Sequence, residues 1–139
     1  MSKATITTSL APAPIGPYNQ AIASGNMLFI SGQICIDPAT GTLVNGDIKA
    51  ETEQVMKNLR AILQEAGMNF MNVVKTTIFL TDMNRFAEMN EIYGHHLDQD
   101  MNGDRNGYCL VIRTNRCRGQ GCGDRCFAHG GIKILLMAI

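Results

Sequence analysis

The stretch that decides the fold is IGPYNQAIASGNMLFISGQ, residues 15–33. Pro17 fixes its own φ and disfavours helix at the preceding residue, so the chain enters the next run in an extended form. The runs YNQAIA and MLFIS flank the sequence SGN at 24–26, whose glycine allows the positive φ that a tight turn needs. This pattern predicts a β-hairpin within extended runs over 5–23 and 27–36. At the end of the second run, Ser31 and Gly32 place a hydroxyl group beside backbone that no side chain covers.

Beyond this hairpin the spacing of the apolar residues changes from two to three or four. Residues 48–66 carry one apolar stripe, which predicts a helix of about five turns that Asp47 caps and Gly67 ends. The run VVKTTIFL at 73–80 predicts a strand because it is short and rich in β-branched residues, and residues 86–93 carry a second helical stripe. The order predicts a β-α-β unit with both helices on one face of a sheet, so the other face needs cover from elsewhere.

Several of these segments occur together in one known family. The hairpin, an Asp37-Pro38 turn, and the runs VMKNLRAILQEAG, NVVKTTIFLTDM and FAEMNEIYG resemble the RidA family of reactive enamine and imine deaminases, formerly grouped as translation inhibitors or endoribonuclease L-PSP. The resemblance covers residues 3–94. It implies an α+β fold of the RidA and chorismate-mutase-like type, a mixed sheet with two helices on one face. It also implies a homotrimer, barrel-like, with active sites in the clefts between protomers.

The activity that the resemblance implies is hydrolysis of 2-iminobutanoate, 2-iminopropanoate, 2-aminoacrylate and related imino or enamino acids to 2-keto acids and ammonia. Such an enzyme needs no cofactor. Tyr18 and Ser31 are the implied catalytic residues, which orient water and substrate, and Gly32 lets the ligand approach the backbone. Asn90 and Cys109 are expected near the same small-molecule pocket.

Binding an imino acid also requires a cation for its carboxylate, and the planar fork of an arginine suits both oxygens. Arg105 stands at nearly the family's distance from Tyr93, although Gly103-Asp104 replaces the usual Pro-Ala. It is interpreted as the third catalytic residue, with a solvated loop arginine as the alternative.

Composition places limits on the class of protein. The chain has 139 residues, which we interpret as a single domain over 1–139. The formal net charge is zero, with 12 basic and 12 acidic residues, so nothing global attracts nucleic acid or an anionic membrane. No apolar run is long enough for a membrane span, so we expect a cytoplasmic protein.

The segment 95–130 differs in composition from the rest, with an excess of cysteine, arginine and glycine. Clustered cysteines in a reducing cytosol indicate metal or reactive thiols before disulfides. However, paired C-x2-C spacings are missing, so we expect no zinc, and His95-His96 is interpreted as a surface pair. The cluster consists of Cys109, Cys117, Cys122, Cys126 and His129.

Two further interpretations concern the C-terminal third. An abrupt change in composition where a family pattern stops is also typical of a shifted reading frame, in which case 95–130 would not be a selected site. The run IKILLMAI at 132–139 resembles the family's final strand, but Leu135 stands where the resemblance implies a glutamate after Lys133-Ile134. This difference predicts impaired activity.

Two other functions remain open. The first is a non-catalytic member that keeps the trimer and binds a small molecule or a protein. The second, which zero net charge disfavours, is the endoribonuclease activity of the older family name.

Overall fold

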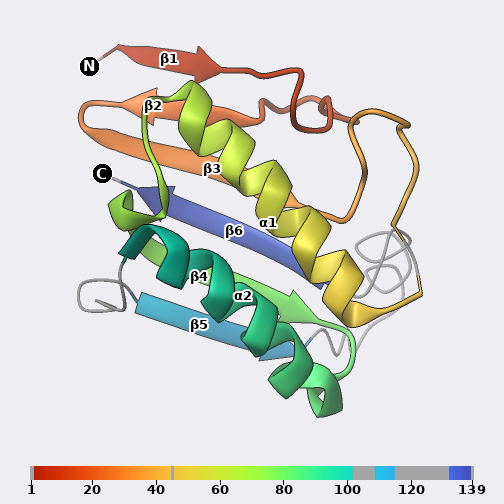
Figure 1. Cartoon of the computed structure of the whole chain (residues 1–139). Helices are drawn as coiled ribbons and strands as arrows, with labels where there is room; N and C mark the ends of the chain where they lie inside the picture. The colour runs from red at the N-terminus through yellow and green to blue at the C-terminus, as the bar shows by residue number, and fades with distance from the viewer. Residues whose placement is uncertain (1, 45, 102–108, 115–131, 139) are drawn as a thin grey trace.

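The computed structural model describes residues 2–44, 46–101, 109–114 and 132–138. Two helices lie on one face of a mixed β-sheet (Figure 1), which confirms the predicted α+β class. Short 3₁₀ turns precede β4 and α2, namely η1 (Phe70–Asn72) and η2 (Met83–Arg85). The strands and helices are β1 (Lys3–Ile6), β2 (Ala21–Ser24), β3 (Met27–Gln33), α1 (Ile48–Glu65), β4 (Val73–Leu80), α2 (Phe86–Met101), β5 (Cys109–Thr114) and β6 (Ile132–Ala138).

The predicted hairpin is confirmed, with shorter strands than expected. β2 and β3 pair antiparallel, Ser24 opposite Met27, and Gly25 takes a φ of 60° in the turn. The extended run expected over 5–23 is wrong in its middle, because 7–20 form a loop. The prolines in this stretch lack the N–H donors of a sheet ladder, and Gln20 binds the loop backbone instead.

The predicted first helix is confirmed at both ends. The Asp47 side chain accepts a hydrogen bond from the Lys49 N–H, and Gly67 takes a φ of 72° just after the last turn. The stripe packs into the core against the sheet, with Val55, Leu59 and Ile62 fully buried. Helix α1 is therefore built as its sequence pattern indicates.

Strand β6 occupies the middle of the sheet, whose order is β1-β2-β3-β6-β4-β5. It pairs antiparallel with β3 on one side and β4 on the other, while β4 and β5 are parallel. The final run is thus a strand, as the resemblance implies, and it lies between β3 and β4. Helix α1 connects β3 to β4 across β6, and α2 connects β4 to β5 (Figure 1).

Helix α2 continues to Met101, well past the expected end of its stripe. His96 is buried with 5% exposure, so the interpretation of His95-His96 as a surface pair is wrong for His96. Its Nε2 lies 2.8 Å from Glu53 Oε2 on α1, because position 96 falls on the helix face that meets α1. His95, the other member of this pair, is exposed.

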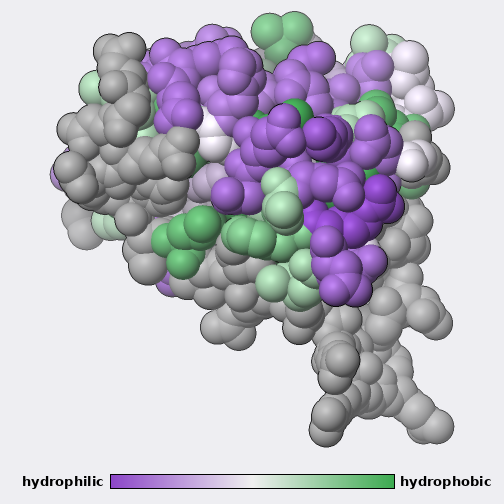
Figure 2. All heavy atoms as spheres, turned by 60° about the horizontal axis from the view of Figure 1, so that its bottom comes forward, coloured by the Kyte–Doolittle hydropathy of each residue, from purple (hydrophilic) through white to green (hydrophobic). Residues whose placement is uncertain are grey.

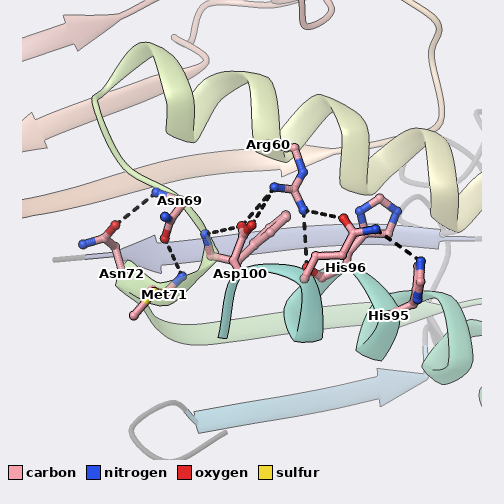
Figure 3. Close-up of polar contacts among 9 residues, drawn as sticks. Arg60, Asn69, Met71, Asn72, His95, His96 and Asp100 are labelled. Atoms are coloured by element: carbon pink, nitrogen blue, oxygen red, sulfur yellow. Dashed lines mark hydrogen bonds and ion pairs between the residues drawn. The ribbon is translucent and has the colours of Figure 1, made fainter. Parts of the chain in front are cut away.

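A polar cluster fastens this extension of α2 to α1 and η1 (Figure 3). Arg60 on α1 donates two hydrogen bonds to the Asp100 carboxylate, at 2.9 and 3.0 Å, and a third to the His96 carbonyl. Asp100 also accepts from the Phe70 N–H, and the Arg60 guanidinium lies 4.8 Å from the Phe70 ring centroid. Residues 95–101 therefore pack against α1 and η1, and the shifted-frame hypothesis for 95–130 stays a prediction.

Much of the described surface is polar. Figure 2 shows hydrophilic side chains over most of the described surface in that view, with hydrophobic ones in a smaller patch. No helix among the described residues combines the length and apolar character needed to cross a bilayer.

Candidate functional site

The candidate site begins at a β-bulge in β3. Ile30 pairs with Leu136 and Gln33 pairs with Ile134, so two residues of β3, Ser31 and Gly32, oppose the single residue Leu135 of β6. A bulge interrupts the ladder locally and redirects the side chains beside it. The Ser-Gly pair that the sequence singled out therefore lies where the sheet is irregular.

Ser31 is held by the segment that leads into β2. Its Oγ donates a hydrogen bond of 2.6 Å to the Asn19 carbonyl, and its N–H donates to the Gln20 carbonyl. The hydroxyl proton is thus engaged, but the oxygen keeps lone pairs that can accept a hydrogen bond.

Tyr18 lies next to this segment with a partly exposed side chain. Its Oη accepts a long hydrogen bond of 3.4 Å from the Ile15 N–H. Among the described residues no acceptor for the phenol proton is present, so Tyr18 can donate to a ligand. Tyr18 and Ser31 therefore offer one donor and one acceptor from neighbouring parts of the chain.

The loop that carries Tyr18 is organised by Gln20, which sequence reasoning missed. Gln20 is 2% exposed; its Oε1 accepts from the Thr8 N–H at 2.7 Å. Its Nε2 donates to the carbonyls of Thr8, Ala11 and Pro12 at 3.0, 3.2 and 2.8 Å. The amide thereby satisfies backbone groups of a loop that has no strand partner. A glutamine in a loop gives no sequence signal of this role.

A small cavity of about 30 Å³ lies between this loop and the end of β3. That volume exceeds the roughly 10–15 Å³ that one water molecule needs. Buried Asn58 on α1 fixes one wall, because its amide donates to the Ile34 and Ile36 carbonyls at 3.1 and 2.9 Å. The residues around the cavity are Pro12, Ala13, Pro14, Ile15, Tyr18, Gln20, Gly32, Gln33, Ile34 and Ile36.

Cys35 lies between two lining residues but faces the core, fully buried. Burial, and secondarily the negative charge of Glu51, raises the pKa of the Cys35 thiol. The thiol therefore stays protonated near neutral pH and is not suited to be a nucleophile at this site.

Gly32 makes room for a side chain that the sequence did not point to. A Cβ on Gly32 would overlap the Lys133 side chain and lie 3.2 Å from its Cγ and Cδ. The lysine stem thus crosses β3 from the neighbouring strand β6. Sequence reasoning placed Lys133 only as the start of the final strand, because the contact depends on the bulge.

The other predicted site residues are not brought to this cavity by the described structure. Asn90 lies on the exposed side of α2 and does not line it. Cys109 begins β5, opposite Lys75 in the parallel register, and Arg105 lies outside the described residues. The assignments of these three residues remain predictions.

A shallow groove of about 320 Å³ lies on the sheet face away from the helices. Phe29, Leu135 and Met137 make it largely apolar, and Phe29 is 42% exposed. The sheet face that the sequence predicts to need cover therefore carries exposed apolar side chains. Lys75, Thr77, Ile30 and Leu136 also line the groove.

Metal binding has no support among the described residues, where no group of three or more His, Cys, Asp or Glu could hold an ion. Cys117, Cys122, Cys126 and His129 of the sequence cluster lie outside the described residues. The expectation about zinc therefore stays a prediction.

Known proteins are similar to this chain over most of its length. A family model described as endoribonuclease L-PSP matches residues 8–111, so the match runs further than the resemblance seen over 3–94. A RutC family protein of Pyrococcus abyssi is 52% identical over 99 residues, which cover 71% of this chain and 78% of the relative. The 2-iminobutanoate/2-iminopropanoate deaminase of Mus musculus is 52% identical over 88 residues, covering 63% of this chain and 65% of the relative.

Solved structures show the same fold over nearly the whole chain. RidA from a Psychrobacter species has a TM-score of 0.78 at 32% identity, covering 97% of this chain and 98% of the other. TdcF of E. coli, solved with bound serine, has a TM-score of 0.82 at 29% identity, with 98% of both chains covered. The chain therefore belongs to the RidA family, whose family model carries the description endoribonuclease L-PSP.

Proposed function

We propose that this protein hydrolyses reactive imino and enamino acids to 2-keto acids and ammonia, at a rate below that of its deaminase relatives. The observation that carries the proposal is the 52% identity to a 2-iminobutanoate/2-iminopropanoate deaminase. The site geometry also supports it, because Tyr18 offers a hydrogen-bond donor and Ser31 an acceptor beside a cavity that can hold water. Serine bound to the structural relative TdcF supports an amino-acid-like ligand.

The proposed chemistry needs one water molecule and two proton transfers. Water adds to the C=N carbon and gives a carbinolamine, which expels ammonia and leaves the keto acid. Tyr18 donates a hydrogen bond to the imine nitrogen, and the Ser31 oxygen accepts one from the attacking water. Both groups act by orienting the reactants, which requires the fixed geometry that Gln20 gives the loop.

Other residues from the sequence analysis complete the proposed site. Arg105 binds the carboxylate, and Asn90 and Cys109 contact the substrate. In the proposed homotrimer these groups meet in clefts between protomers, and the apolar groove around Phe29 supports such an assembly. The proposal includes no cofactor and no nucleic-acid or membrane partner. It places the protein in the cytoplasm.

The test is a coupled assay in which a serine or threonine dehydratase forms 2-aminoacrylate and a semicarbazide trap competes for it. We expect keto-acid release that is slower than with the Mus musculus deaminase but above the uncatalysed rate. Tyr18→Phe and Ser31→Ala should each lower it about tenfold or more, since misplacing a reactant by about 1 Å can cost about 10²-fold.

Ser24→Ala is the matched control, because it removes a hydroxyl from the far end of the hairpin and should leave the rate unchanged. Release equal to the uncatalysed rate in the unmodified protein would overturn the proposal. That result would favour the alternative of a non-catalytic binding protein, which one observation supports. The described lining of the cavity contains no carboxylate to act as a general base.

A further inference from the structure

Gln33 directly follows Ser31 and Gly32, the two site residues at the bulge. It ends β3, and it is buried with 6% exposure. Together with Tyr18 it lines the cavity between the loop and the end of β3. A buried amide needs hydrogen-bond partners for its oxygen as well as for its nitrogen, because an unpaired polar group inside a protein is costly.

Hydrogen bonding fixes the orientation of the Gln33 amide. Its Nε2 donates to the Ser31 carbonyl at 3.2 Å. A carbonyl only accepts, so the amide nitrogen faces Ser31 and the Oε1 points away from that carbonyl. Among the described residues, no group donates a hydrogen bond to this oxygen. The oxygen is not sealed in the core either, because in the described structure the buried side-chain atom that lacks a partner is Nδ1 of His96.

The cavity therefore brings together two groups that each lack one partner. The Gln33 oxygen is an acceptor without a donor, and the Tyr18 hydroxyl is a donor without an acceptor among the described residues. The cavity volume of about 30 Å³ leaves room for a water molecule between them. A water that donates to Gln33 Oε1 lies next to Tyr18, the residue that orients the imine nitrogen in the proposed function.

We propose that Gln33 Oε1 binds the water molecule that attacks the substrate. The inference rests on the proposed function for the reaction, and it adds to Ser31 a second acceptor for that water. With one hydrogen on each acceptor, the water directs a free lone pair at the C=N carbon. The C–O bond forms from this lone pair, the C=N electron pair moves to the nitrogen, and one proton leaves the water while one joins the nitrogen. A neutral amide orients the water without taking its proton, in agreement with a rate below that of the deaminase relatives.

The test compares two variants in the semicarbazide-trap assay across a range of pH. Gln33→Met removes the acceptor and should lower keto-acid release about tenfold or more at each pH, since a misplaced reactant can cost about 10²-fold. Gln33→Glu keeps an acceptor and adds a base. Its rate should rise with pH as the new carboxyl group ionises, to at least about tenfold above Gln33→Met, because a general base contributes about 10²–10⁴. If both variants instead keep the pH profile of the unmodified protein, the inference is overturned.

Gln64→Met is the control, because Gln64 is exposed on α1 and the variant makes the same chemical change away from the cavity. Crystal structures of the unmodified protein and of Gln33→Met give a second measurement, which needs neither activity nor a folded Gln33→Glu. We expect a water within about 3.0 Å of Gln33 Oε1 in the first structure and its loss in the second. Such a water without any keto-acid release would refute the proposed function and leave the water site standing. Keto-acid release by a protein with no water at Gln33 Oε1 would do the reverse.

Discussion

The side chain of Gln20 connects a loop without regular structure to the edge of the sheet. One amide reaches four backbone groups between Thr8 and Pro12, and all of its polar atoms are buried. Leaving such backbone groups unpaired costs more than their hydrogen bonds contribute when made. Tyr18 lies two residues before Gln20, so the same contacts hold Tyr18 in position.

Replacing Gln20 tests this role. Gln20→Ala should lower the free energy of unfolding by about 2–3 kcal/mol, since buried carbonyls lose their donors. Gln20→Glu should be destabilising too, because a carboxylate accepts from Thr8 but cannot donate to the carbonyls. Urea unfolding at fixed protein concentration measures both, with exposed Gln64→Ala as control. Stability equal to the unmodified protein in both Gln20 variants would contradict the role.

Besides the Glu53–His96 contact, two ion pairs of a lysine or arginine join α1 to α2 in the described structure, and they differ in burial. Arg60 and Asp100 have side-chain exposures of 23% and 15%, and they share further partners in Phe70 and His96. Lys49 and Glu91 form a single contact of 3.0 Å that is largely exposed. Exposed pairs contribute little, whereas a network of partly buried groups resists separation.

Asp100→Ala should therefore reduce the free energy of unfolding by about 1–3 kcal/mol, because Arg60 and the Phe70 N–H lose their acceptor. Glu91→Ala removes the carboxylate of the exposed pair and should change the urea midpoint little. The two variants compare like with like, since each removes one acid from α2. Equal midpoints would show that the cluster in Figure 3 does not hold the helices together.

The two faces of the sheet have different neighbours. Helices cover one face, while the groove around Phe29 leaves the other partly apolar and open. An apolar face of this kind is typical of a contact between subunits. The proposed homotrimer would bury it.

Phe29→Glu should dissociate the trimer, because each subunit would bury a carboxylate in an apolar contact. Met83→Glu is a matched control, as Met83 and Phe29 are both 42% exposed but Met83 lies on η2 outside the groove. Size-exclusion chromatography with light scattering gives the assembly state. A stable monomer of the unmodified protein at micromolar concentration would contradict the proposed assembly.

The sequence could predict what depends on local pattern. Asp47, Gly67 and the apolar stripe between them gave helix α1, and the β-branched run at 73–80 gave β4. In the candidate site, the hairpin motif pointed to Tyr18, Ser31 and Gly32, but their roles remain proposals.

Contacts between distant segments could not be predicted in this way. The bulge that brings Lys133 over Gly32 depends on pairing between β3 and β6, and the four bonds of Gln20 depend on loop geometry. The burial of His96 depends on α2 meeting α1, which its short, irregular apolar stripe did not reveal.

The central place of β6 has a consequence for how the chain reaches this structure. Its pairing of Leu28 with Ala138 joins residues that are nearly the whole length of the chain apart. β3 pairs with β2 and β4 with β5, but each lacks its second neighbour until residues 132–138 have been synthesised, so the sheet cannot be completed while the ribosome is still translating earlier segments. Pairings at such long sequence separation fold slowly, because loop closure comes before the contacts that offset it. During that interval the edges of β3 and β4 that pair with β6 are exposed, and the nascent chain is most prone to bind chaperones and to aggregate.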